Sequence, residues 1–188
     1  MEESELIQKL RSGNRESYSE LFRLYGRQVY HTCLGLLQHE ADAEDVCQEV
    51  FIEVHRSVKN FREDAKISTW LYRIASNKCL DHIRAKKRGK RSGNVVELDG
   101  DVNIQISSEH TFVHPGVALE NKERAKILFA AISGLPENQK VAFTLNKVDG
   151  LSYAEICEVM QMKLPAIESL IHRAKQNLKK SLENYYRS

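Results

Sequence analysis

The sequence lacks the features that identify a disulfide-stabilised or metal-binding domain. It contains only four cysteines and three prolines in 188 residues. Cys33, Cys47, Cys79 and Cys157 form no C-x-x-C pair, and their spacing to histidine does not match a zinc site. We therefore expect buried free thiols in a reducing compartment, and no metal or other cofactor.

Long hydrophobic runs are also absent. The longest is ILFAAI, residues 127–132, whereas a membrane-spanning helix needs about 20 apolar residues. The N-terminal segment MEESELIQKL is acidic and lacks the apolar core of a signal peptide. These absences predict a cytoplasmic protein without membrane insertion.

Enzyme motifs are missing as well. The sequence contains no G-x-x-x-x-G-K-[ST], G-x-G-x-x-G, H-E-x-x-H or G-x-S-x-G motif, and its seven histidines are scattered. Paired acids such as Glu44 and Asp45 lie on a helix face that is expected to be exposed. We therefore expect no catalytic residue and a protein that is not an enzyme.

Charge is present in blocks of one sign, although the net charge is only +2. Residues 40–53 and 97–109 contain acids but no lysine or arginine, residues 84–91 contain bases but no acid, and residues 163–180 are mainly basic. A solvated helix face explains any one block. Four blocks in one chain favour separate surfaces for separate partners.

Helical periodicity dominates the rest of the sequence and predicts an all-α fold. We expect helices over residues 4–11, 15–38 and 41–58, and a further helix capped by Ser68 or Thr69. After a break, helical patterns resume at residue 117 and run to 132. Pro136 is expected at the first position of the next helix, which Asp149 and Gly150 end.

Residues 89–116 show no helical pattern and are rich in glycine and acids. Because a structureless stretch of this length is uncommon inside a compact domain, we interpret it as a linker, with a β-hairpin as the alternative. The sequence thus predicts two small helical domains, residues 1–88 and 117–184, joined by an irregular linker.

The second domain contains a predicted helix-turn-helix. Ser152 and Glu155 form a capping box that opens a short helix. A tight turn at residues 161–163 then leads to a basic helix, whose apolar face comprises Leu164, Ile167, Ile171, Ala174 and Leu178. Its outward face would fit the DNA major groove. The alternative is an ordinary helical hairpin.

Trp70 is the only tryptophan, and it begins a helix that ends in the basic block 84–91. An aromatic ring beside cations can stack on an unpaired base while the cations hold the phosphates. The alternative is that Trp70 is a core residue.

Taken together, these segments resemble a bacterial RNA polymerase sigma factor of the sigma-70 family, specifically the extracytoplasmic-function (ECF) type. Residues 42–61 resemble region 2.2, residues 61–88 resemble regions 2.3 and 2.4, and residues 135–182 resemble region 4. The most specific motif is W-L-x-x-I-A-x-N-x-x-x-D-x-x-R, from Trp70 to Arg84.

The resemblance implies an initiation subunit that binds core polymerase, recognises promoter minus-10 and minus-35 elements and promotes strand opening. The implied polymerase-binding residues are Asp45, Gln48, Glu49, Ile52 and Glu53. The implied minus-10 residues are Phe61, Lys66, Ser68, Thr69, Trp70, Arg73, Asn77, Arg84 and Arg88. The implied minus-35 residues are Lys163, Pro165, Ala166, Glu168, Ser169, His172, Arg173 and Lys175.

The implied partners are the β′ coiled coil and β flap of core RNA polymerase, promoter DNA and an anti-sigma factor. The acidic linker would follow the polymerase's RNA path. Glu168 and Leu170 depart from the basic residues common in this family, so we expect an altered minus-35 preference. The competing hypotheses are a separate helix-turn-helix regulator, a single-strand-binding protein and, least favoured, an enzyme.

Overall fold

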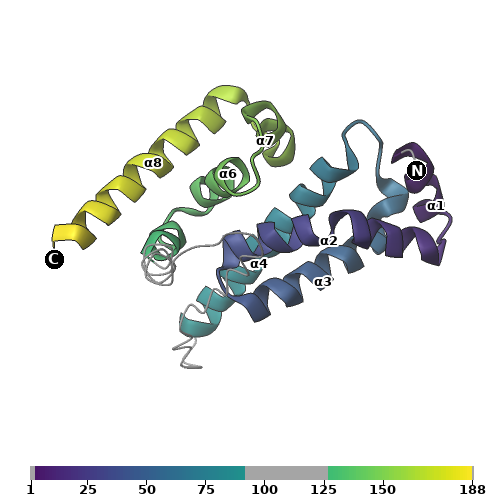
Figure 1. Cartoon of the computed structure of the whole chain (residues 1–188), viewed down its shortest axis with the longest axis horizontal. Coiled ribbons are helices and arrows are strands. Elements are labelled where there is room, and N and C mark those ends of the chain that lie inside the picture. The colour runs from purple at the N-terminus through teal and green to yellow at the C-terminus, as the bar shows by residue number, and fades with distance from the viewer. Residues whose placement is uncertain (1–2, 92–126, 188) are drawn as a thin grey trace, which may run out of the picture.

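The computed structural model of the chain describes residues 3–91 and 127–187 (Figure 1), and every regular element within these ranges is helical. The first unit comprises α1 (Glu3–Arg11), α2 (Arg15–Leu37), α3 (Glu40–Ser57), the short 3-10 helix η1 (Val58–Asn60) and α4 (Ile67–Arg91). The second comprises a helical segment over residues 127–133, then α6 (Glu137–Lys147), α7 (Tyr153–Met160) and α8 (Leu164–Arg187). The predicted all-α class with two helical units is confirmed.

The first unit is a bundle in which α2, α3 and α4 pack pairwise. Val46, Val50 and Val54 recur on one face of α3 and are buried there. Leu71, Ala75 and Cys79 do the same on α4, as the helical periodicity predicts. These apolar faces leave the opposite faces of α3 and α4 available for polar contacts.

The start of α4 differs from the prediction. Ser68 and Thr69 lie inside the first turn, because the helix already begins at Ile67. The backbone N–H of Ile67 donates to the Glu3 carboxylate at 2.6 Å. The cap is therefore supplied by α1, so neither predicted N-cap residue is needed.

The second unit also departs from prediction at two positions. Pro136 is the N-cap of α6 and not its first helical residue, because its extended backbone precedes the helix that starts at Glu137. Leu164 is 47% exposed, although the other four residues predicted on the apolar face of α8 are buried. As the first residue of α8 it lies beyond the edge of the packed surface.

The two units pack against each other through α2 with α6 and through α4 with α7. Figure 1 shows α6 and α7 lying between α8 and the first unit. Val141, Leu145 and Ile156 of the second unit belong to the same buried apolar cluster as Leu36 and Leu71 of the first. The two units therefore share one apolar cluster, and a second, smaller cluster lies within the second unit around Ile132, Leu135, Ala174 and Leu178.

Gly35 permits the close approach of α2 to α6. A Cβ atom at this position would lie 2.9 Å from Cγ2 of Thr144, whose side chain is completely buried. Since real Cβ atoms do not make such short contacts, any other residue would push the two helices apart.

The cysteines agree with the prediction of free thiols. Cys33, Cys47 and Cys79 come from α2, α3 and α4 and are buried, whereas Cys157 on α7 is partly buried. Burial, together with Cys33, raises the pKa of Cys47 to about 12. A hydrogen bond with Cys33 and burial raise the pKa of Cys79. The Cys47 and Cys79 thiols are therefore protonated and unreactive at neutral pH.

Most of the predicted linker lies outside the described residues, as do its hairpin alternative and the first part of the helix expected over 117–132. Helix α4 continues to Arg91, beyond the predicted start of the linker at residue 89. In the described ranges, no helix is both long and apolar enough to span a membrane.

Candidate nucleic-acid interface

The first candidate surface is the outward face of α3. The structure brings together the five residues predicted to bind polymerase, which lie one helical turn apart opposite the buried valines. Asp45, Gln48 and Glu49 are exposed, Ile52 is 50% exposed, and Glu53 is half-buried. We call these five residues the α3 surface.

Lys78 of α4 lies beside this surface. Its Nζ is 3.8 Å from a Glu49 oxygen and 3.7 Å from a Glu53 oxygen. Such partly exposed pairs are weak, so the two carboxylates remain available to a basic partner.

An exposed phenylalanine next to the α3 surface was missed in the sequence. Phe22 of α2 is 56% exposed, and its ring meets Phe51 edge-on at a centroid distance of 5.0 Å. Together with Ile52 these rings form an apolar rim beside the acids. In the sequence, Phe22 is simply an aromatic residue next to the buried Leu21. This position does not show whether its side chain lies in the core or on the surface.

The second candidate surface is built on the start of α4. Trp70 is partly exposed and stacks on the buried Phe61 with centroids 4.7 Å apart and an interplanar angle of 30°. Arg11 of α1 holds the preceding loop, because its guanidinium donates to the Phe61 carbonyl and to Glu63. One face of the indole is therefore fixed to the core, whereas the ring retains an exposed part.

The remaining predicted minus-10 residues occupy different environments. Thr69 is buried, like Phe61, and Ser68 is half-buried, so these three offer little side-chain surface. Lys66, Asn77 and Arg88 are exposed.

Arg73 and Arg84 are engaged by the second unit. Nη2 of Arg73 donates to the carbonyl oxygen of Glu158 in α7 at 2.8 Å. Arg84 pairs with Glu137 of α6 at 3.0 Å and with Asp81 at 3.5 Å. In this closed arrangement of the two units, part of the face of α4 that would meet DNA is covered.

The third candidate surface is the helix-turn-helix formed by α7 and α8. The predicted capping box is present: Glu155 N–H donates to the Ser152 hydroxyl at 3.3 Å, and the Ser152 N–H donates to the Glu155 carboxylate at 2.8 Å. The Ser152 hydroxyl also donates to the Glu155 carboxylate at 2.7 Å, and this bond, together with the one from the Ser152 N–H, lowers the pKa of Glu155. Gln161, with φ of 53°, makes the turn into α8.

Five of the eight predicted minus-35 residues line a hollow beside the start of α8. Its volume is about 490 Å³, and its lining includes Pro165, Glu168, Ser169, His172 and Lys175. Lys163, Ala166 and Arg173 are exposed on the same helix end and its preceding turn. Glu168 makes no hydrogen bond or ion pair with another described residue, so its carboxylate is available to a ligand.

Asp149, just after α6, is a further residue of interest that the sequence did not single out. The Thr32 hydroxyl of α2 lies 3.0 Å from its Oδ1 and 3.1 Å from the Gln28 carbonyl, and this hydroxyl has one proton. Oδ2 is buried without a partner among the described residues. Burial raises the pKa of Asp149 to about 7, although the Thr32 bond opposes this. An Asp149 protonated on Oδ1 would donate to the Thr32 hydroxyl, which would then donate to the Gln28 carbonyl, while Oδ2 would still have no partner among the described residues.

In the part of the chain that the structure describes, no cluster of His, Cys, Asp and Glu side chains is arranged to hold a metal ion. The three candidate surfaces consist instead of exposed acids, one stacked aromatic pair and cations on helices. These groups are suited to recognising protein and nucleic acid.

Both units of the chain, and thus all three candidate surfaces, match known protein families. Residues 21–89 match the family described as Sigma-70 region 2, and residues 125–178 match Sigma-70, region 4. The chain is 31% identical to the RNA polymerase sigma-H factor of Pseudomonas aeruginosa over 182 residues, which cover 97% of this chain and 94% of that protein. It is 29% identical to the ECF RNA polymerase sigma factor SigW of Bacillus subtilis, with 95% of each covered.

The fold is also that of a solved sigma factor. The Bartonella quintana sigma factor RpoE, solved in complex with the anti-sigma factor NepR, superimposes with a TM-score of 0.70 at 18% identity and covers 89% of this chain and 98% of its own. Thus the fold, both family matches and the aligned relatives all indicate a sigma factor. The chain belongs to the ECF type of the sigma-70 family, which comprises transcription initiation factors and not enzymes.

Proposed function

We propose that this chain directs core RNA polymerase to promoters by three contacts. Residues 1–88 dock on the polymerase and engage the minus-10 element, residues 117–184 engage the minus-35 element, and residues 89–116 link them. The observation that best supports this proposal is that three features occur together in one member of this family: an acidic exposed helix face, an aromatic–cationic helix and a capped helix-turn-helix.

The α3 surface would bind the β′ coiled coil. Asp45 and Glu49 supply negative charge to a basic partner, while Ile52 supplies an apolar contact that is 50% exposed before binding. Phe22 extends the apolar contact toward α2. Charge complementarity would speed association, and the apolar centre would contribute affinity.

Helix α4 would engage the minus-10 element and promote strand opening. The exposed part of Trp70 would stack at the edge of the duplex, supported from below by Phe61. Lys66, Asn77 and Arg88 are exposed and accessible to DNA, whereas Arg73 and Arg84 are held by α7 and α6. The second unit must therefore move away before all of these residues reach DNA.

Helix α8 would read the minus-35 element. Lys163, Arg173 and Lys175 would neutralise phosphates. Glu168 and Ser169, which line the hollow beside α8, would face the base edges when this helix enters the major groove. A carboxylate accepts hydrogen bonds, for example from the amino group of cytosine, and repels phosphate. Glu168 would therefore alter the sequence preference relative to family members with a base at this position.

Two further partners belong to this proposal. The β flap would hold the second unit, and an anti-sigma factor would hold the chain inactive. Bartonella quintana RpoE was solved with the anti-sigma factor NepR, and its fold is shared by this chain.

Promoter-dependent run-off transcription with purified core polymerase tests the proposal. We expect transcripts only when the chain is present, and a strong loss with Glu49→Lys, which reverses a charge on the α3 surface. Glu16→Lys, an exposed substitution at the start of α2, is the matched control. The proposal is wrong if no polymerase complex forms and Glu49→Lys changes nothing.

The same experiment separates the competing functions. A helix-turn-helix regulator would bind promoter duplex without polymerase and would not use the α3 surface. A single-strand-binding protein would show no duplex specificity and would not use α7 and α8.

A further inference from the structure

A second polar site lies at the junction of the two units, away from the helix-turn-helix. It is a cavity of about 200 Å³ at the end of α2. Its polar lining consists of Asp42, His82, Lys86 and Lys87 from the first unit and Ser133 and Lys140 from the second. At roughly 30 Å³ per water molecule, the volume accommodates a phosphate-sized group together with a few waters.

Lys140 is the unusual residue of this cavity. Its side chain is only 6% exposed, yet its ammonium makes no hydrogen bond or ion pair with any described residue. Burial lowers its pKa, the charge of Lys87 lowers it further, and Glu137 opposes the change. A largely buried lysine without an anionic partner among the described residues is costly, and its place in the cavity lining makes its ammonium available to an anion.

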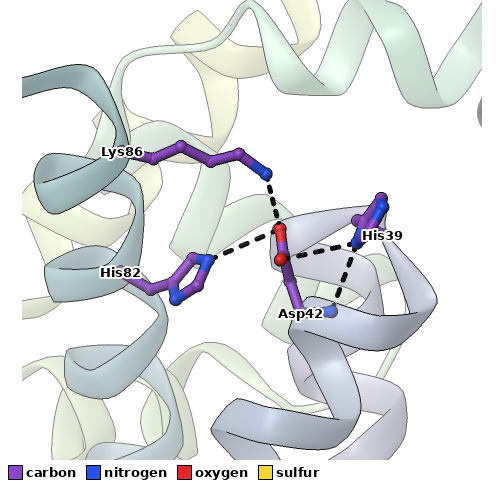
Figure 2. Close-up of polar contacts among 4 residues, drawn as sticks. All are labelled: His39, Asp42, His82 and Lys86. Atoms are coloured by element: carbon purple, nitrogen blue, oxygen red, sulfur yellow. Dashed lines mark hydrogen bonds and ion pairs between the residues drawn. The ribbon is translucent and has the colours of Figure 1, made fainter. Parts of the chain in front are cut away.

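Asp42, the one acid among the described lining residues, already contacts positively charged and imidazole side chains. Figure 2 shows Asp42 between His39, His82 and Lys86. Lys86 donates to Asp42 at 2.7 Å, and His82 lies 3.4 Å from the same oxygen. Burial opposes ionisation of Asp42, but Lys86, His39 and His82 outweigh it and keep its pKa below the ordinary value. Asp42 therefore neutralises Lys86 in part, and Lys140 has no carboxylate partner among the described residues.

The junction retains an excess of positive charge. Glu137 already pairs with Arg84 at 3.0 Å and with Lys87 at 3.7 Å, and Asp81 pairs with Arg84 at 3.5 Å. Lys86, Lys87, Lys140 and Arg84 thus face three carboxylates, those of Asp42, Glu137 and Asp81, which leaves one positive charge in excess. Lys87 is largely exposed and Lys86 has further donor protons, so both can turn toward a ligand next to Lys140.

We propose that this junction cavity binds a small phosphate-bearing solute, with Lys140 as its buried anchor and Lys86 and Lys87 as outer ligands. A phosphate dianion meets several ammonium groups at once, whereas a chloride ion or a single carboxylate leaves one of them uncompensated. Ser133 of the second unit also lines the cavity, and its hydroxyl donates to the side-chain oxygen of Gln38 at 2.7 Å.

Occupancy would favour the closed arrangement, because the ligand contacts residues of both units. A ligand that binds only this arrangement stabilises it by mass action. Under the proposed function, which this consequence presupposes, the bound solute would keep Arg73 and Arg84 from promoter DNA. The binding step itself requires neither polymerase nor DNA.

Isothermal titration calorimetry of the free full-length chain with inorganic phosphate and pyrophosphate, at constant ionic strength, tests the proposal. We expect saturable binding that is at least tenfold weaker in Lys140→Met, which keeps the apolar stem. Lys147→Met, at the exposed end of the same helix, is the matched control and should bind as the original chain does. If Lys140→Met does not fold, Lys87→Met should weaken binding severalfold.

Several outcomes would overturn the assignment. These are heats no larger than those of sodium chloride, equal affinity for Lys140→Met and the original chain, or equal losses in the Lys140 and Lys147 variants. Displacement of pyrophosphate by a DNA duplex of unrelated sequence would also overturn it, because the cavity would then belong to the DNA-binding surface. None of these outcomes bears on run-off transcription, so the proposed function stands or fails separately.

Discussion

At the scale of single residues, Trp70 has two environments. Its ring packs on the buried Phe61 and is also partly exposed. The sequence left core anchor and base platform as alternatives, and the geometry is compatible with both at once. Removing the side chain therefore affects both stability and base stacking, and the two effects have to be measured separately.

Trp70→Ala is expected to impair promoter opening more than polymerase binding. Loss of one base stack costs about 1–3 kcal/mol, whereas the α3 surface is untouched. Permanganate reactivity of promoter thymines reports opening, and a pull-down with core polymerase reports binding. Trp70→Phe, which keeps an aromatic contact with Phe61, is the control; equal losses of opening and binding would make Trp70 a core residue only.

Glu168 is expected to change the minus-35 preference. Selection of bound promoters from a random pool should recover different minus-35 sequences with the original chain and with Glu168→Lys, because a lysine donates where a carboxylate accepts. Glu183→Lys, an exposed change near the far end of α8, should leave the selected sequences unchanged. Recovery of the common ECF minus-35 sequence by both the original chain and the Glu168→Lys variant would refute this.

Asp149 is expected to make the closed arrangement dependent on pH. The closed form holds its proton up to pH about 7, whereas an exposed aspartate releases it near 3.8. The closed form thus binds more protons between these values, so it becomes less stable relative to the open form as pH rises through this interval. The change is at most about 1.4 kcal/mol per pH unit and ends above pH about 7.

Fluorescence energy transfer between labels on α2 and α8 measures this dependence. The closed fraction should fall from pH 5 to 7.5 in the original chain and remain constant in Asp149→Asn, which carries no titrating proton. An identical pH profile for both proteins would exclude Asp149 as the responsible group.

At the scale of elements, helix positions were predictable within a few residues because each helix buries one periodic apolar face. The errors lie at helix ends. The cap of α4 comes from Glu3, which is distant in sequence, so local motifs pointed to Ser68 and Thr69 instead. The capping box of α7 was predicted correctly because both partners, Ser152 and Glu155, are local.

Ser152→Ala is expected to destabilise the second unit by about 1 kcal/mol, since it removes the N-cap acceptor. Urea denaturation followed by circular dichroism measures the change. Ser19→Ala is a suitable control, because Ser19 is exposed within α2 and its hydroxyl lies as far as 3.5 Å from the Arg15 carbonyl oxygen. Identical midpoints for the two variants would mean that the box contributes nothing to stability.

At the scale of the whole molecule, the contact between the units could not be predicted from the sequence. Periodicity shows which residues are apolar, but not that Val141 and Leu145 share a core with Leu36 of the other unit. The candidate surfaces were predicted as local segments of the sequence, and their binding roles stay predictions. That the second unit binds Arg73 and Arg84 and so covers part of α4 is evident only from the three-dimensional arrangement.

Gly35→Ala is expected to open the closed arrangement. The added methyl group would lie 2.9 Å from Thr144 of α6, and the next nearest atoms belong to Val148. The clash thus falls between the units and spares the first unit itself. Small-angle X-ray scattering should show a larger radius of gyration, and promoter binding with polymerase should be stronger.

Gly89→Ala is the matched control, because no atom lies within 4 Å of the added Cβ. It should leave the scattering profile unchanged. A compact Gly35→Ala protein would show that the contact between α2 and α6 does not limit opening.

The four thiols lie in two different environments, so their reactivity can report two different motions of the native chain. Cys33, Cys47 and Cys79 are sealed inside the first unit, whereas Cys157 packs at the edge of the core that the two units share. A thiol-specific reagent would therefore modify the partly exposed Cys157 at a rate that rises when the units separate, and the other three at a rate set by unfolding of the bundle. Labelling kinetics, resolved by mass spectrometry, would time the two motions in one unmodified sample.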